Sequence, residues 1–176
     1  MLPKNRGRTI SELVEDLQSD DWEIAEGASE VLVGRGGTDV ADSLIPVLRS
    51  TDARVRNWAA HVLREIGDDR AVEPLVNAIN VPENCNNRGS LVYALQTLDC
   101  RNFFQFLFDL AIEGNYEVRC MVLMIFEDQE FELTPTIVAE VTNKLDAFTR
   151  RKHNRPEDED FARELQIALV NIGNKN

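Results

Sequence analysis

Apolar residues recur along the chain with a period of 31 residues. Three columns of this repeat are apolar in all five copies. The columns are Leu13, Leu44, Leu75, Phe106 and Ile137; Val14, Ile45, Val76, Leu107 and Val138; and Leu17, Leu48, Ile79, Leu110 and Val141. Because 43% of the residues are apolar, this agreement has a chance probability of roughly three in a million for a single register. A fixed period of this length is typical of helical-hairpin repeats.

Each copy of these columns predicts one helix, and a second apolar set predicts another helix after it. The spacing i, i+1, i+4 within a copy puts its three residues on one side of a helix, which must then be buried. The second set comprises Ala28, Ala59, Ser90 and Met121; Val31, Val62, Tyr93 and Met124; and Leu32, Leu63, Ala94 and Ile125. Small residues in its first column would let neighbouring helices approach closely. Each repeat is therefore predicted to be a helical hairpin.

Polar and glycine-rich segments separate the predicted helices. Ser50-Thr51-Asp52 lies between the two helices of one repeat and is typical of a turn followed by a helix cap. Gly67 lies between repeats, where glycine suits the left-handed residue that ends a helix. Gly34-Arg35-Gly36-Gly37 lacks the Lys-Ser/Thr element of a phosphate loop, so we interpret it as a helix stop.

One hairpin cannot bury its own apolar side, so the repeats are predicted to stack into an all-α solenoid, an α-α superhelix. We expect residues 1–176 to form a single domain of about five repeats. The approximate repeat ranges are 9–37, 38–68, 69–99, 100–130 and 131–174. The fourth repeat should be displaced by one residue, because Val118-Arg119 rather than Glu117-Val118 matches Val55-Arg56.

An insertion interrupts the fifth repeat near residues 146–160. The second helix of this repeat, residues 161–173, matches residues 55–67 but lies about thirteen residues late. The insertion carries a basic cluster, then Pro156 and four acidic residues. Proline and negative charge suit the start of the last helix. The rest of the insertion is either a solvated loop or a loop that contacts a partner, because loops often carry specificity.

Charge and hydropathy restrict the classes of function. A net charge of −12 tells against nucleic-acid binding, which depends on Lys and Arg. The acidity either favours a basic partner and speeds its encounter or keeps the protein soluble. The longest apolar run, residues 120–126, is far shorter than the roughly 20 residues of a membrane span. Acidic residues occupy the place of the apolar core of a secretory signal, so we expect a cytoplasmic protein.

Groups that could support chemistry are few. Cys85, Cys100 and Cys120 are widely spaced and form no CxxC pair, so we expect reduced, partly buried thiols. His61 and Glu65 are four residues apart on a predicted helix, but the further ligands of a zinc site are not evident. No Ser, His and Asp constellation is identifiable. We predict no catalysis, no cofactor and no bound metal.

The segment Val55–Leu75, VRNWAAHVLREIGDDRAVEPL, resembles the HEAT-like repeat named after the phycobilisome lyases. The VR, AA, L, IGD, RAV and PL elements of the family pattern are all present in this repeat. The other repeats keep the apolar columns but lack some of these elements. The resemblance implies a HEAT-like solenoid. It also implies that Arg56 and Arg119, at the VR position, pair with carboxylates between repeats such as Asp52 or Asp68.

Proteins with this repeat include bilin lyases, iron-dependent deoxyhypusine hydroxylases, DNA glycosylases and many adaptors. The hydroxylases carry several His-Glu dipeptides as iron ligands, whereas neither His61 nor His153 is followed by Glu. The glycosylases present a basic cradle to DNA, in contrast to this acidic chain. The lyases offer no short motif that could be transferred to residues of this sequence.

The second helices supply the candidate binding residues, because in HEAT-like solenoids they usually line the concave side. These residues are Glu26, Glu30, Asn57, Trp58, His61 and Arg88. Trp58 stands where the neighbouring repeats have Gly27 and Gly89. The indole either packs in the core or is a binding anchor, since aromatic residues are enriched at hot spots.

These observations predict a non-catalytic protein-binding module whose partner is another protein with a basic surface. A bacterial immunity protein that neutralises a basic toxin fits the size, the acidity and the lack of targeting. The alternative is a bilin lyase-like or chromophore-handling protein. The sequence leaves the oligomeric state open.

Overall fold

The computed structural model describes residues 7–150 and 156–175. Every regular element in these residues is a helix, which confirms the predicted all-α fold. The chain divides into two compact units, unit 1 (Met1–Asp99) and unit 2 (Cys100–Asn176), and each is described by itself. The single domain expected from the sequence, with its repeat ranges, stays a prediction. In the described residues no helix combines the length and the apolar character needed to span a membrane.

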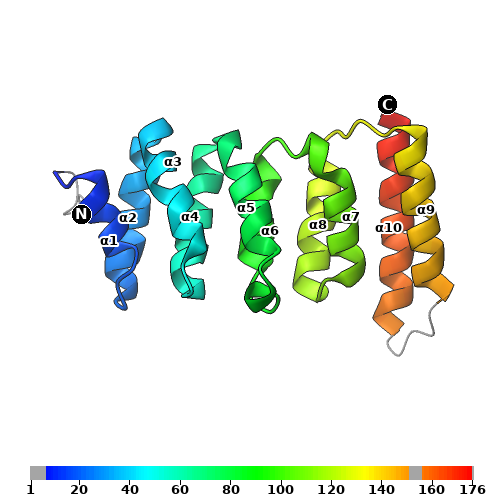
Figure 1. Ribbon diagram of the computed structural model, residues 1–176, viewed down its shortest axis with the longest axis horizontal. Coiled ribbons are helices and arrows are strands. Elements are labelled where there is room, and N and C mark those ends of the chain that lie inside the picture. Colours follow the sequence, from blue (N-terminus) through cyan, green and yellow to red (C-terminus); the bar gives the residue numbers. More distant parts are fainter. Residues whose placement is uncertain (1–6, 151–155, 176) are drawn as a thin grey trace. The chain divides into compact units, whose positions relative to one another are not determined.

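Unit 1 consists of three successive helical hairpins (Figure 1). The hairpins pair α1 (Ile10–Asp16) with α2 (Trp22–Arg35), α3 (Thr38–Leu44) with α4 (Ala53–Ile66), and α5 (Val72–Ile79) with α6 (Gly89–Ala94). Short 3-10 helices accompany them: η1 (Ile45–Arg49), η2 (Asp69–Ala71), η3 (Pro82–Asn84) and η4 (Leu95–Thr97). Helix α4 packs against both α2 and α6, so the second helices of the three hairpins lie next to one another.

The two apolar sets form the core of unit 1 as the spacing predicts. Leu13, Leu44 and Leu75 on the first helices are 0% exposed, as are Ala28 and Ala59 on the second helices. Burial of each leucine side chain contributes about 2 kcal/mol. The alanines add no bulk beyond Cβ, which allows α2 and α4 to pack closely.

Polar caps and glycines set the ends of the second helices. Asp21 accepts the backbone N–H of Glu23, and Asp52 accepts that of Arg54 at 2.8 Å. The Arg54 guanidinium also donates to Asp52, and these hydrogen bonds hold the pKa of Asp52 below its ordinary value. Helix α2 ends at Gly36, which confirms the predicted helix stop. Helix α4 ends at Gly67, whose φ of 69° is readily adopted only by glycine.

The register of α6, the second helix of the third hairpin, differs from the prediction by one residue. Tyr93 was expected to be a core residue, but it is 37% exposed. The buried residues of this turn are instead Leu91, Val92, Ala94 and Leu95, which correspond to Ala59, Ala60, Val62 and Leu63 of α4 at a spacing of 32 residues. One extra residue in the turn before α6 accounts for the shift. The displacement expected at the fourth repeat therefore already begins in the third.

Unit 2 contains η5 (Arg101–Phe103), α7 (Phe104–Glu113), α8 (Tyr116–Asp128), α9 (Pro135–Arg150) and α10 (Pro156–Lys175). Helix α7 packs on α8 and α9, and α10 packs on the same two helices. Aromatic rings dominate the core. The Phe104 ring centroid lies 5.1 Å from that of Phe126 and 5.3 Å from that of Phe131. Phe148 of α9 meets Phe161 of α10 with ring centroids 6.2 Å apart.

Two apolar columns lose their phase in unit 2. Val138 and Met124 were expected to be buried, but they are 43% and 36% exposed. In α8 the buried residues are Val118, Val122, Ile125 and Phe126, which continue the one-residue shift. The period of 31 therefore describes the burial of the second helices only in the first two repeats. The first-helix column Leu17, Leu48, Ile79, Leu110 and Val141 is buried in all five.

The insertion near residues 146–160 is mostly helical. Helix α9 continues to Arg150, so the loop expected before Pro156 is wrong over residues 146–150. The start of the last helix at Pro156 confirms the prediction from proline and the acidic residues. Residues 151–155, which carry part of the basic cluster, lie outside the described residues.

Candidate functional site

The second helices of unit 1 present a surface that contains most of the predicted binding residues. We define the second-helix face as Trp22, Glu23, Glu26 and Glu30 of α2, Trp58, His61 and Arg64 of α4, and Tyr93 of α6. These residues are exposed or half-exposed, whereas the opposite sides of the same helices are buried. The face follows from helix periodicity, because the apolar stripe points to the first helices and leaves the other side to solvent.

Aromatic rings join α2 to α4 on this face. The ring centroids of Trp22 and Trp58 are 4.7 Å apart, and those of Trp58 and His61 are 6.1 Å apart with a T-shaped geometry. Trp22 is 65% exposed, whereas Trp58 is half-buried. Trp58 thus packs on an exposed neighbour and belongs to the surface layer. Such paired indoles offer a large apolar area with a polar N–H, the combination enriched at protein interfaces.

Three carboxylates lie beside these rings on α2. Glu23, Glu26 and Glu30 are exposed, and their spacings of three and four residues place them along one stripe of the helix. In residues 7–150 and 156–175, these side chains make no hydrogen bond and no ion pair. The stripe therefore presents three carboxylates to which an external cationic group could bind.

A second contact on the face joins α4 to α6. The Arg64 guanidinium carbon lies 4.3 Å from the centroid of the Tyr93 ring, a cation–π geometry. Arg64 also pairs with Glu65 and lies 3.5 Å from the side-chain oxygen of Gln96. The Arg64 side chain therefore has three neighbouring side-chain contacts, whereas the acidic stripe has none in the described residues.

Comparison with known proteins agrees with this architecture. Residues 10–96 match the family model described as HEAT repeats. This segment is similar to HEAT repeats, and the match supports a HEAT-like repeat family. No curated protein matches the chain. HEAT repeats commonly mediate protein–protein interaction, and neither the match nor the fold distinguishes the phycobilisome lyase type among them.

Two predicted residues, Asn57 and Arg88, are not part of the second-helix face. Asn57 is half-buried, and its side-chain oxygen is buried without a hydrogen-bond partner in the described residues. Arg88 is half-buried at the N-cap position of α6, with a buried Nε that likewise lacks a partner. The one-residue shift makes Arg88 the counterpart of Arg56 rather than of Asn57. Among the six predicted residues, Trp58 and His61 form the direct ring contact.

Four residues of the face were missed by sequence reasoning. Tyr93 was assigned to a core column, and Trp22, Glu23 and Arg64 were not considered. Trp22 directly follows Asp21, the N-cap of α2. A large aromatic residue at the exposed first position of a capped, acidic helix was the available signal. Arg64 and Tyr93 carried no such signal, because their contact depends on the shifted register of α6.

The arginine contacts of these HEAT repeats differ from those expected. Arg56 does not pair with Asp52 or Asp68. It donates from Nη1 to the backbone carbonyl of Ser50 at 2.7 Å, while Asp52 pairs with Arg54 and Asp68 with Arg70. Arg54 and Arg70 each lie two positions after the capping aspartate that they bind. They therefore occupy the carboxylates that were expected to pair with Arg56.

Metal-ligating groups do not converge in the described part of the chain. No group of three or more His, Cys, Asp or Glu side chains there could hold a metal ion. His61 is exposed, Cys85 is exposed, Cys100 is buried and Cys120 is half-buried, and none of the three cysteines forms a disulfide in the described residues.

Proposed function

We propose that the chain is a non-catalytic protein-binding module and that its second-helix face holds a partner protein with a basic surface. The observation that carries the proposal is the exposed Trp22–Trp58 pair beside three carboxylates that have no partner in the described residues. The aromatic pair supplies an apolar anchor. The carboxylates supply charge complementarity, which steers encounter and selects cationic partners.

The finer form of the proposal is a bacterial immunity protein that neutralises a basic toxin. A net charge of −12 supports it, because an acidic inhibitor associates rapidly with a basic enzyme. The expected cytoplasmic location belongs to the same proposal. The bilin lyase-like alternative stays a prediction from the sequence, and no contact of the described residues favours it.

The proposal is tested with a partner captured on the immobilised chain and eluted by salt. Trp58→Ala and Trp22→Ala should each weaken binding of the purified partner by about 2 kcal/mol, because each removes one half of a packed aromatic anchor. Tyr116→Ala is the matched control, since Tyr116 is an aromatic residue of unit 2 that is 78% exposed. Calorimetric titration measures the affinities, and thermal melting of each variant separates a lost anchor from a damaged fold.

The acidic stripe makes a different contribution. Glu26→Lys should chiefly slow association and flatten its dependence on ionic strength, whereas Glu113→Lys, a charge reversal at an exposed site in unit 2, should change the rate less. Unchanged affinity in both tryptophan variants, together with an unchanged association rate for Glu26→Lys, would show that the partner binds elsewhere.

A further inference from the structure

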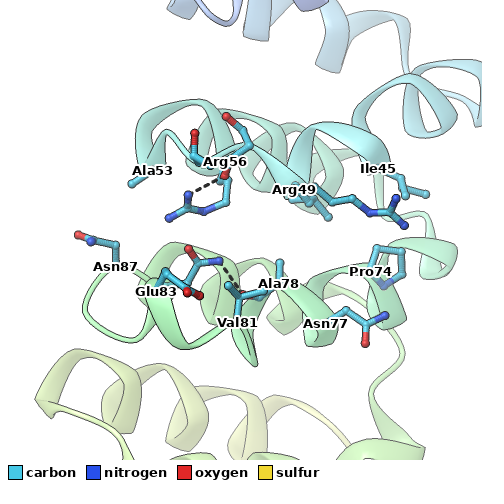
Figure 2. A pocket seen from close by; sticks show the side chains of 14 residues that line it. Ile45, Arg49, Ala53, Arg56, Pro74, Asn77, Ala78, Val81, Glu83 and Asn87 are labelled. Carbon is cyan, nitrogen blue, oxygen red and sulfur yellow. Dashed lines mark hydrogen bonds between the residues drawn. The ribbon is translucent and has the colours of Figure 1, made fainter.

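A cavity of about 730 Å³ lies between the second and third hairpins of unit 1 (Figure 2). It shares no residue with the second-helix face. Its walls are η1, the start of α4 with Ala53 and Arg56, α5, and the two turns that precede α4 and α6. The apolar part of the wall comes from Leu48, Pro74, Ala78 and Val81. A volume of this size is sufficient for a small organic ligand or a few residues of a peptide.

A buried guanidinium lines this cavity. Arg56 is only 3% exposed, and its Nη1–H donates to the carbonyl of Ser50 at 2.7 Å. Its Nε is buried and has no hydrogen-bond partner in the described residues. A guanidinium has five N–H donors, and a buried donor left unpaired is costly. The positive charge of Arg56 is likewise not balanced by a carboxylate of the described chain.

Arg119 occupies in unit 2 the helix position that Arg56 occupies in unit 1, and it binds a carboxylate. Arg56 and Arg119 both lie four residues after the N-cap of their helix, and both reach back to a carbonyl of the preceding turn. Arg119 in addition donates to the carboxylate of Asp158 at 2.6 Å and lies 4.6 Å from the ring centroid of Phe161. A carboxylate followed three residues later by an aromatic ring thus fills this position in unit 2.

In unit 1 the following repeat places amides at the equivalent position. Asn84 and Asn87 line the cavity on that side, and Asn84 donates to the carbonyl of Ala78 at 2.8 Å. Two charged side chains complete the wall: Arg49 and Glu83 are exposed, and neither makes a hydrogen bond or ion pair in the described residues. In Figure 2, Arg56 points toward Asn87, whereas Arg49 extends toward Ile45 and Pro74.

We infer that this cavity binds a carboxylate joined to an apolar body, with the carboxylate on Arg56 and the body against the wall formed by Leu48, Pro74, Ala78 and Val81. The ligand would take the place that Asp158 and Phe161 occupy on Arg119. A charge-assisted pair with a partly desolvated guanidinium is among the stronger polar contacts in proteins. The carboxylate can belong to a free organic acid or to a peptide side chain, and the inference does not rest on the proposed protein-binding face.

Nuclear magnetic resonance of the full chain tests the inference through the Arg56 Nε–H signal and the amide signals of Ala78 and Val81. The probes are 3-phenylpropanoate and a blocked peptide with Asp and, three residues later, Phe. Their neutral controls are 3-phenylpropanamide and the same peptide with Asn. We expect saturable shifts with either acid, with a dissociation constant of about 1 mM, as is usual for ligands of this size, and none with the neutral controls. Tighter binding of the peptide would assign the ligand to a protein, and tighter binding of phenylpropanoate would assign it to a small acid.

The two exposed charged residues of the cavity wall should change the affinity for the acid in opposite directions when they are neutralised. Arg49→Gln should weaken binding of the better acid about threefold and Glu83→Gln should strengthen it about threefold, because each removes one exposed charge beside the carboxylate. Arg54→Gln, which removes an exposed charge from α4 outside the cavity, is the matched control and should have no effect. Arg56→Lys keeps the charge and the bond to Ser50 but loses the planar fork, and should weaken binding about tenfold.

Four results would overturn the inference. They are the absence of shifts up to about 10 mM acid, a range that covers fragment affinities; equal shifts with the neutral controls; shifts reproduced by sodium sulfate; and unchanged affinity in both Arg49→Gln and Glu83→Gln. The two rim variants alter exposed side chains, so they remain informative even if Arg56→Lys disturbs the fold.

Discussion

An arginine stands near the start of three second helices: Arg56 is buried, and Arg88 and Arg119 are half-buried. Arg56, Arg88 and Arg119 each keep a buried Nε without a partner in the described residues. Their surroundings differ. Arg119 has the carboxylate of Asp158 and lies near the rings of Phe148 and Phe161, whereas Arg56 has a carbonyl and a cavity. The same residue type therefore pairs with a carboxylate in unit 2 and lines a cavity in unit 1.

The Arg119–Asp158 pair should stabilise unit 2 measurably. Both side chains are more than four-fifths buried, with 16% and 18% exposure. Asp158→Asn leaves a largely buried guanidinium without its carboxylate, so the free energy of unfolding should fall by about 2 kcal/mol. Asp160→Asn is the control. Asp160 pairs with Arg163 at exposures of 69% and 72%, and its loss should change stability by less than about 0.5 kcal/mol. Equal effects of the two variants in urea unfolding would contradict this assignment.

At the level of the helices, the ends are set by local chemistry and the interior by packing. Aspartate caps α2 and α4, and glycine ends both helices. Helix α6 has neither feature in regular form: it follows a short 3-10 helix, has Arg88 at its N-cap position and passes directly into η4. The weak local signals at α6 coincide with the register shift, and burial of Leu91, Val92, Ala94 and Leu95 decides its orientation.

Glycine substitutions test the C-terminal ends of the second helices. Gly67 has a φ of 69°, so Gly67→Ala should lower the free energy of unfolding by about 1 kcal/mol through left-handed strain. Gly34 lies within α2, and a Cβ there would meet no atom within 4 Å. Gly34→Ala should therefore raise stability by up to about 1 kcal/mol, because alanine favours the helix. Denaturant unfolding of both variants measures the sign of each change in the free energy of unfolding. Destabilisation by Gly34→Ala, or a neutral Gly67→Ala, would show that the ends of α2 and α4 are held by packing alone.

At the level of the whole molecule, the two units are stabilised by different cores. Aliphatic and alanine residues of the first and second helices fill unit 1, whereas phenylalanine rings fill much of unit 2. Both tryptophans of the chain, Trp22 and Trp58, lie in unit 1. Tryptophan fluorescence therefore reports on unit 1 alone, while circular dichroism reports on the helices of both units.

Selective destabilisation shows whether the units unfold separately. Phe126 is 2% exposed in unit 2, and Phe126→Ala should cost about 3 to 5 kcal/mol. We expect the variant to split the unfolding curve measured by circular dichroism, with the tryptophan transition left at the wild-type urea concentration. Leu63→Ala in unit 1, where Leu63 is 0% exposed, should shift the tryptophan transition. If Phe126→Ala shifts both probes together, the chain unfolds as the single domain that the sequence predicts, with neighbouring repeats strongly coupled.

The sequence by itself determined the helical-hairpin repeat, because columns such as Leu17, Leu48 and Ile79 show an apolar stripe at helical spacing. Such a stripe can be buried only when the hairpins stack. It also determined helix ends such as Gly36, Gly67 and Pro156, since caps and proline act within a few residues.

The tertiary structure alone decided which side chains meet between repeats. The exposure of Tyr93, the contact of Trp22 with Trp58 and the choice of Ser50 rather than Asp52 or Asp68 by Arg56 depend on helix register and on distances between repeats. One extra residue in a turn moves each side chain on the following helix by about 100°, a rotation that a fixed sequence period cannot represent. For the same reason the sequence did not predict the cavity beside Arg56, which depends on the packing of the second hairpin against the third.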